Sequence, residues 1–314
     1  MNKKTLIAGL VLLLLVGIFF LLKNRDSTEK LSRVFNADST AIARIELIDP
    51  ADTLVIAKTG SDWRLEVPVN WEANPQTVER LFNNVINAEY SKTVMTTSKD
   101  AASRYKLVPG TALQIKTFDS KGKLRDHVYF GNIGNPYDYF RYEGSSEIYQ
   151  LKKLISNTFN SSLEQWRSPV VIRVSESEIG SIEVKYSQGS HVLTHKDKDW
   201  WFKDAANDFK IPLENRAIIR TVNILNKLDT FVFYDDPAPE LLAVFKQPMA
   251  TVLIKLKDGK SRKLVFAETA NKEYLLLMDD NPKTLYGLVK DSVLRFTVNS
   301  EHYKELPYIA PPQQ

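Results

Sequence analysis

Cysteine is absent from this chain of 314 residues, and its absence excludes several kinds of site at once. Disulfide frameworks, thiolate catalysis, cysteine zinc sites and a lipid-modified N-terminal cysteine all require that residue. The absence does not choose a redox compartment, because a chain without thiols is compatible with an oxidising or a reducing one.

Long runs of one charge are also missing, and there are only four histidines. The 42 basic residues are nearly matched by 38 acidic ones, which leaves a net charge of +4. We therefore predict no nucleic-acid partner. With 43% hydrophobic and 25% charged residues, the chain has the composition of a folded protein, and its length suits about two domains.

Recognisable catalytic motifs are missing as well. There is no Gly-x-Ser-x-Gly elbow, and Gly131-Asn132-Ile133-Gly134-Asn135 lacks the Gly-Lys-Ser/Thr ending of a phosphate loop. Acidic pairs such as Asp235-Asp236 lie in predicted turns, where the chemistry of the turn explains them. We predict no enzymatic activity, no catalytic residue and no cofactor.

His191 and His195 have the spacing of a metal site on a helix. Their segment aligns instead with a predicted strand, and residues four apart on a strand are about 13 Å apart. That separation is too large for one ion, so we predict strand histidines and no metal site.

The chain begins with an uncharged apolar segment, Thr5–Leu22. Its 18 residues span about 27 Å as a helix, close to the roughly 30 Å of a bilayer core. A cleaved signal peptide is the alternative, but its apolar stretch is usually about 7–15 residues and ends in small side chains. This segment ends in Phe19-Phe20-Leu21-Leu22, so we expect a retained, single-pass anchor.

The charges that flank this segment set its expected orientation. Lys3 and Lys4 precede it and Lys23 and Arg25 follow it, so the positive-inside count is nearly tied. The free N-terminal amine adds a charge in front, and a short basic head before an apolar run is also the pattern of an export signal. We favour a cytoplasmic N-terminus and an extracytoplasmic soluble region.

The soluble region is predicted to hold two copies of one unit. Displacing the sequence by 137 positions aligns it with itself without a gap, and rare residues come into register. These are Asp62-Trp63 with Asp199-Trp200, Pro75 with Pro212, Gly122 with Gly259, Tyr137 with Tyr274, Tyr149 with Tyr286, and Phe159 with Phe296.

Each unit is expected to contain strands, then a helix, then more strands. Alternation of apolar and polar residues is typical of half-buried strands. Asn74 and Pro75 have the character of a helix N-cap and first helical position, and a matching helix should follow Pro212. A short helix is also expected near Leu151–Phe159. The predicted strands are 41–48, 53–58, 63–67, 112–118, 124–130, 137–142, 251–256, 262–266 and 274–278.

The predicted fold class is therefore α+β, with an N-terminal transmembrane helix followed by two repeated units of mostly antiparallel sheet with packed helices. The predicted parts are a cytoplasmic head (1–4), a transmembrane anchor (5–22), a linker (23–30), repeat unit 1 (31–168), repeat unit 2 (169–303) and an extended tail (304–314).

Several short motifs follow one another through the first unit in a distinctive order. They are Asp62-Trp63-Arg64-Leu65 with Pro68, Asn74-Pro75, Tyr105-Lys106-Leu107-Val108-Pro109, Gly131, Tyr139-Phe140-Arg141 and Ile148-Tyr149. Together with the apolar N-terminal segment, this ordered set resembles the DUF4340 domain family of bacterial membrane-associated proteins. The second unit departs from the set, since Leu276-Leu277-Met278 replaces the Tyr-x-Arg motif and the Tyr-x-Leu-x-Pro motif has no clear counterpart.

The resemblance implies a location in the bacterial inner membrane, but it supplies no catalytic residue. Members of the family often look like companions of ABC-2 type transporters and of gliding-motility-like auxiliary proteins. An ABC transporter permease or such an auxiliary protein is therefore the partner that the resemblance implies, although likeness of fold alone does not establish function.

Exposed aromatic side chains beside arginine favour protein interfaces. Tyr137, Tyr139 and Arg141 should share one face of a strand, and Trp201 should face away from Trp200. These four residues, Tyr137, Tyr139, Arg141 and Trp201, are the candidate interface, and packing within the unit is the alternative.

The expected function is a membrane-anchored, extracytoplasmic interaction module that serves an ABC-type transporter or an envelope assembly. Two alternatives remain open. One is an envelope enzyme that acts on glycan or peptide, and the other is a ligand-binding module that uses the cleft between the two units.

Overall fold

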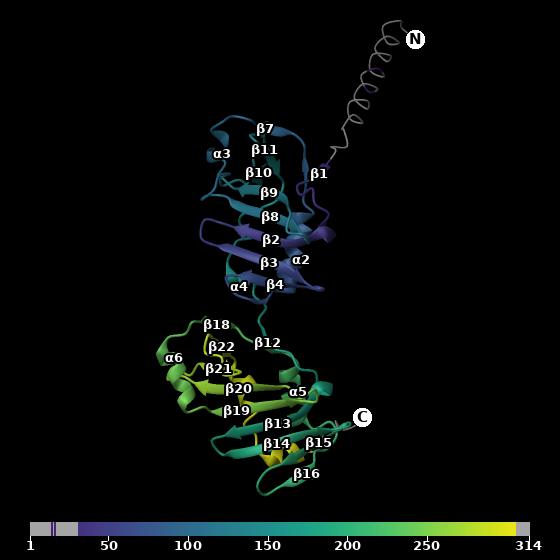
Figure 1. The fold of residues 1–314 in the computed structure, drawn as a ribbon, viewed down its shortest axis with the longest axis vertical. Coiled ribbons are helices and arrows are strands. Elements are labelled where there is room, and N and C mark those ends of the chain that lie inside the picture. The colour runs from purple at the N-terminus through teal and green to yellow at the C-terminus, as the bar shows by residue number, and fades with distance from the viewer. Residues whose placement is uncertain (1–13, 15, 17–30, 306–314) are drawn as a thin grey trace, which may run out of the picture. The chain divides into compact units, whose positions relative to one another are not determined.

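The computed structural model describes Leu14, Val16 and residues 31–305, and the chain divides into two compact units at Ser168 and Pro169 (Figure 1). Apart from Leu14 and Val16, the predicted anchor Thr5–Leu22 lies outside the described residues, as do the predicted linker and most of the predicted tail. Among the helices that are described, none is long and apolar enough to cross a membrane. The anchor therefore stays a prediction.

Unit 1 is built on a nine-stranded sheet in which every neighbouring pair of strands is antiparallel. A two-stranded ribbon of β1 (Leu31–Arg33) and β6 (Glu89–Ser91) accompanies it. Across the sheet the strands are β5 (Trp71–Glu72), β4 (Asp62–Val67), β3 (Thr53–Thr59), β2 (Ile42–Ile48), β8 (Leu113–Asp119), β9 (Leu124–Gly131), β10 (Asp138–Tyr142), β11 (Ile148–Leu151) and β7 (Val94–Thr96).

Unit 2 has the same organisation, again with antiparallel neighbours. Its ribbon pairs β12 (Val170–Ile172) with β17 (Leu228–Asp229). Across its sheet the strands are β16 (Asp208–Lys210), β15 (Asp199–Lys203), β14 (Gly189–Lys196), β13 (Ile179–Tyr186), β19 (Ala250–Leu256), β20 (Ser261–Glu268), β21 (Tyr274–Met278), β22 (Thr284–Leu288) and β18 (Val232–Asp235).

The helices are short and lie between these strands. In unit 1 they are η1 (Ser39–Ala41), α2 (Pro75–Leu81), η2 (Phe82–Ile86), α3 (Ala101–Arg104) and α4 (Leu163–Trp166). In unit 2 they are η3 (Glu176–Glu178), α5 (Arg216–Asn226), α6 (Pro239–Ala243), η4 (Val244–Lys246), α7 (Lys290–Leu294) and α8 (Ser300–Lys304).

The identical strand order confirms the predicted repeat of two mostly antiparallel units. Strands β8 and β19, for example, lie 137 positions apart at both ends. The gap-free alignment is wrong over the next two strands, because Arg125 forms a β-bulge in unit 1 that unit 2 lacks. Beyond the bulge, Phe140 of unit 1 is equivalent to Leu276 of unit 2, because the two residues pair with equivalent residues of the strand that precedes each of them. Tyr274 is therefore equivalent to the residue that follows Tyr137, and not to Tyr137 itself, as the gap-free alignment predicted.

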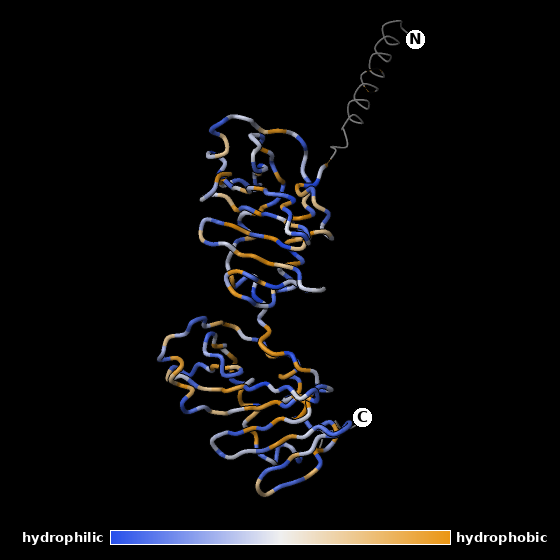
Figure 2. The backbone as a smooth tube through the Cα atoms, viewed as in Figure 1, coloured by the Kyte–Doolittle hydropathy of each residue, from blue (hydrophilic) through white to orange (hydrophobic). Residues whose placement is uncertain are grey.

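Local sequence explains the start of the first helix. Asn74 caps α2, accepting a hydrogen bond from the backbone N–H of Gln76 at 3.1 Å, as predicted. The corresponding helix of unit 2, α5, starts later than Pro212 suggested, because Asn215 is its cap. Hydrophobic stretches follow the sheet strands of both units (Figure 2).

The helix predicted near Leu151–Phe159 is wrong. Leu151 belongs to β11, and the chain then turns. The buried carboxylate of Asp138 accepts hydrogen bonds from the backbone N–H groups of Ile155 and Ser156, both at 2.6 Å. These contacts hold the segment in a turn, which is closed by a hydrogen bond from the N–H of Phe159 to the carbonyl oxygen of Ile155 at 2.9 Å, and Ile155 and Phe159 still reach the core.

Candidate functional site

Two of the predicted interface residues, Tyr139 and Arg141, lie on the outward face of β10 and are covered there by residues 101–112. Tyr139 is 6% exposed, and its ring centroid lies 4.4 Å from that of Tyr105. The Nε of Arg141 donates a hydrogen bond to the carbonyl oxygen of Leu107 at 2.7 Å. Its guanidinium also lies 4.1 Å from the ring centre of Tyr129. Both side chains therefore hold residues 101–112, which we call the covering segment, against the sheet.

Gly131 makes room for the same segment. A Cβ atom at this position would lie 2.4 Å from the carbonyl oxygen of Tyr105 and 2.6 Å from that of Lys106. Lys106 itself has a φ of 57°, so the chain turns sharply at this point. The motifs around Tyr105, Gly131 and Arg141, which are far apart in the sequence, thus form one packing arrangement.

Tyr137 and Trp201, the other predicted interface residues, remain at the surface with 39% and 38% exposure. Trp201 lies on β15 with the Nζ of Lys196 at 5.7 Å from its ring centre. Trp200 faces the opposite way and is 6% exposed, as the alternation of a strand predicts. Tyr137 and Trp201 belong to different units, and their role as an interface stays a prediction.

Both central histidines lie on β14, as predicted. His191 is 3% exposed and packs against the rings of Phe202 and Tyr303, with centroid distances of 5.2 and 5.6 Å. Burial lowers the pKa of His191 to about 4, and its Nε2 has no hydrogen-bond partner among the described residues. His195 stacks on Trp200 at 4.6 Å. Within residues 31–305 no three histidine or acidic side chains gather into a metal-binding group.

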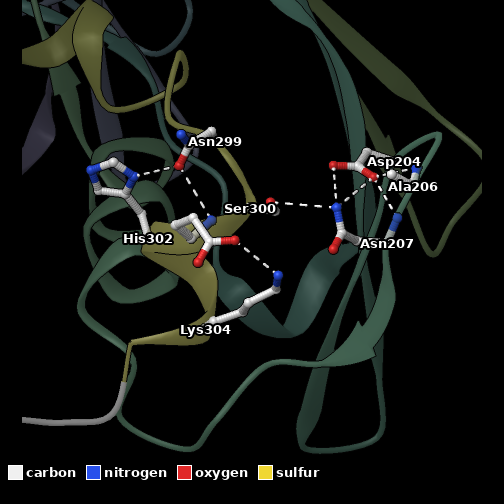
Figure 3. A network of polar contacts seen from close by, with 8 residues as sticks. Asp204, Ala206, Asn207, Asn299, Ser300, His302 and Lys304 are labelled. Atoms are coloured by element: carbon white, nitrogen blue, oxygen red, sulfur yellow. Dashed lines mark hydrogen bonds and ion pairs between the residues drawn. The ribbon is translucent and has the colours of Figure 1, made fainter.

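Figure 3 shows the main polar network of unit 2, which joins the β15–β16 turn to α8. The carboxylate of Asp204 accepts the backbone N–H of Asn207 at 2.6 Å, and the Asn207 side chain reaches the hydroxyl of Ser300 at 3.5 Å. Asn299 caps α8, and its Oδ1 lies 2.9 Å from Nδ1 of His302. These contacts close a turn and cap a helix, which gives the network a structural role.

The outward face of the unit 2 sheet carries a groove of about 520 Å³ that sequence reasoning missed. Its floor is formed by the side chains of Leu253, Val265 and Leu277, and Phe245 and Pro248 form one wall. We call these five residues the outer groove. Pockets of this volume lie within the range that accepts ligands and peptide side chains.

Ion pairs border the apolar floor. Lys263 contacts Asp280 at 2.8 Å, and Lys255 pairs with Glu183. Of the four charged side chains in the lining, Glu183, Lys263 and Asp280 are thus paired, and Lys185 forms no ion pair among the described residues. The groove presents an apolar centre with a polar rim.

The repeat explains why the groove exists in unit 2. Strand pairing places Leu277 at the position of Arg141 and Leu253 at the position of Lys116. Arg141 holds the covering segment of unit 1 by donating a hydrogen bond to the carbonyl oxygen of Leu107, whereas a leucine side chain has no donor. The counterpart of that segment in unit 2 contacts β20 through η4 and provides the groove wall at Phe245 and Pro248. The sequence already indicated this difference, since unit 2 lacks the Tyr-x-Arg motif.

Comparison with known proteins identified one family. Its profile, described as "Domain of unknown function (DUF4340)", matches residues 63–243, more than half of the chain. The match runs from β4 of unit 1 to α6 of unit 2. No curated protein and no solved structure matches the chain. The predicted family resemblance is confirmed.

Proposed function

We propose, from the premise that the chain belongs to the DUF4340 family, that it is a membrane-anchored, extracytoplasmic interaction module. It would serve an ABC-type transporter or an envelope assembly, with Thr5–Leu22 as its anchor. The observation that carries the proposal is the outer groove, where Leu253, Val265 and Leu277 form an apolar floor inside a rim of ion pairs.

The occupant that fits this groove is a short apolar segment of a membrane partner. The apolar floor favours apolar side chains, because burying them removes their surface from water at about 25 cal/mol per Å². Hydrogen-bonding groups on either side of such a segment would meet the charged rim. In both units part of this sheet face is covered by the chain itself, so a peptide-like segment is a form of ligand that the face accommodates.

A membrane tether makes a weak contact sufficient. Two proteins held in one membrane meet at a high effective concentration, so a small groove can support a lasting association. The anchor and the groove would therefore act together, the first by confining the chain to the membrane and the second by selecting the partner.

The test is co-purification of the full chain in mild detergent. We expect stoichiometric recovery of a permease or ATPase subunit with the native chain. The double variant Leu253→Lys, Leu277→Arg places in the groove the residues that unit 1 carries at the same positions, and it should lose the partner while remaining folded. Ile219→Lys is the control, because it adds a positive charge to unit 2 at a residue that is 44% exposed on α5 and does not line the outer groove.

Recovery of the subunit by the double variant at the native level would contradict this use of the outer groove. Failure to recover any transporter or envelope subunit would contradict the proposed function itself. Hydrolytic turnover that one acidic substitution abolishes would favour the enzyme alternative, and a small molecule retained through purification would favour the ligand-binding alternative.

A further inference from the structure

A second groove, of about 590 Å³, lies at the end of unit 1 where β1, β7 and β11 come together (Figure 1). Its lining includes Leu31 from β1, Met95 from β7, and Lys152 and Lys153, which directly follow β11. The ribbon strand β6 contributes Tyr90, whose ring packs on Phe140 in the core at 4.8 Å. The groove therefore has a rigid base.

The rim of this groove combines exposed apolar and basic side chains. Leu31, Val94 and Met95 are 54%, 38% and 47% exposed, although large apolar residues more often face a core. Lys92, Lys152 and Lys153 are exposed next to them. We call these six residues the basic-apolar end of unit 1: Leu31, Lys92, Val94, Met95, Lys152 and Lys153.

The three lysines carry uncompensated charge. Among the described residues none of them forms an ion pair; Lys153 donates one long hydrogen bond to the carbonyl oxygen of Asn84 at 3.5 Å. The one acidic side chain in the groove lining is Glu89. In the outer groove of unit 2, by contrast, Lys255 and Lys263 pair with acidic side chains. Unpaired lysines beside exposed apolar side chains match the surface of an anionic bilayer, which offers phosphate groups above an apolar interior.

Chain length places this end near the membrane if Thr5–Leu22 is the anchor. Eight residues separate Leu22 from Leu31, and a chain spans at most about 3.3–3.6 Å per residue. Whatever the conformation of these residues, Leu31 must lie within about 30 Å of the membrane boundary. The basic-apolar end is thus the part of unit 1 that the tether keeps closest to lipid.

We propose that the basic-apolar end of unit 1 rests on the bilayer surface and binds anionic phospholipid. Lys92, Lys152 and Lys153 contact headgroup phosphates, while Met95 reaches into the interface between headgroups and acyl chains. This inference rests on the anchor of the proposed function. It adds a second contact that orients unit 1 on the membrane.

The absence of native cysteine allows a direct test in the full chain. Met95→Cys carries an environment-sensitive fluorophore as the only thiol, and the protein is reconstituted into vesicles with or without phosphatidylglycerol in phosphatidylcholine. We expect a blue-shifted emission and strong quenching by nitroxide-labelled lipid in the anionic vesicles. Ser61→Cys is the control, since Ser61 is exposed in the turn before β4, near the opposite edge of the sheet.

Charge reversal tests the role of the lysines. Lys92→Glu, Lys152→Glu and Lys153→Glu combined should reduce quenching at position 95 several-fold, and high salt should act in the same direction. Quenching no stronger at position 95 than at position 61, or quenching unchanged by the reversal, overturns the inference. Flotation separates the two failures: a chain that floats with vesicles but shows no quenching refutes only this contact, whereas a chain that does not float refutes the anchor as well.

Discussion

His191 offers a measurable link between pH and the stability of unit 2. It occupies the position of Leu54 in unit 1, a fully buried core residue, so His191→Leu replaces the imidazole with the side chain that the repeat already accepts there. At pH 7 we expect this variant to be as stable as the native chain or more stable. The reason is that the substitution removes a buried Nε2 without a hydrogen-bond partner in the described structure.

The expected magnitude follows from the pKa of the histidine. Burial lowers that pKa from 6.5 to about 4, which means that the folded state keeps His191 neutral. Between these pH values the unfolded chain binds a proton that the folded chain does not, so the free energy of unfolding falls as the pH falls. The loss amounts to about 3 kcal/mol by pH 4. The charge of Asp204 opposes the shift and is the main electrostatic influence on the ring.

Hydrogen exchange of peptides from β14, corrected for the intrinsic effect of pH on exchange, reports the stability of unit 2 separately from unit 1. The native chain should lose protection in β14 between pH 6.5 and 4, and His191→Leu should abolish most of that loss. His302→Gln is the control, because His302 is exposed on α8. An equal loss of protection in the native chain and in His191→Leu, or an imidazole that titrates near pH 6.5 by NMR, refutes the reasoning.

Three further predictions concern the packing of unit 1. Gly131→Ala should lower its free energy of unfolding by about 1–3 kcal/mol in denaturant titrations, since the new methyl group meets two backbone carbonyl oxygens. Asp138→Ala should cost about 2–4 kcal/mol in the same assay, because two backbone N–H groups lose the carboxylate that accepts them. Arg141→Leu should release the covering segment, and limited trypsin digestion should then cleave after Lys106 several-fold faster than in the native chain. An unchanged cleavage rate at Lys106 contradicts that role of Arg141.

The strands of both units could be predicted because each carries its own alternation of apolar and polar residues. Ile45 and Leu47, for example, alternate with polar residues, and both side chains face the core. The cap at Asn74 is equally local, since its side chain binds a backbone N–H two residues on. Local rules sufficed for these elements because the alternation of a strand and the cap of a helix are both written within a few consecutive residues, even though the strands pair with distant partners.

The rest depended on contacts between distant residues. The apolar residues of the segment after β11 have helical spacing, namely Leu151, Leu154, Ile155 and Phe159. The segment does not form a helix, because Asp138 on β10 accepts hydrogen bonds from its backbone N–H groups. The bulge at Arg125 shifts the register of two strands without leaving a mark in the apolar pattern.

The candidate site was only half predictable for the same reason. The placement of Tyr139 and Arg141 on one strand face is correct, because alternation along a strand determines it. The covering segment above them comes from residues about 27 to 40 positions earlier in the chain, and no local pattern in the sequence predicts that it folds back over β10. Burial of an outward strand face is a tertiary property, which composition and periodicity do not encode.

The two units together indicate where function should be sought. The motifs around Tyr105, Gly131 and Arg141 hold the covering segment of unit 1 in place, so they account for a fold more directly than for an activity. Unit 2 keeps the sheet but has Leu277 in place of Arg141 and Leu253 in place of Lys116, and both leucines line the outer groove. A duplicated scaffold can keep its sheet while one face of one copy takes on a separate role. In a functional test, the residues to exchange between the two units are therefore those that differ between the copies, more than those that the copies share.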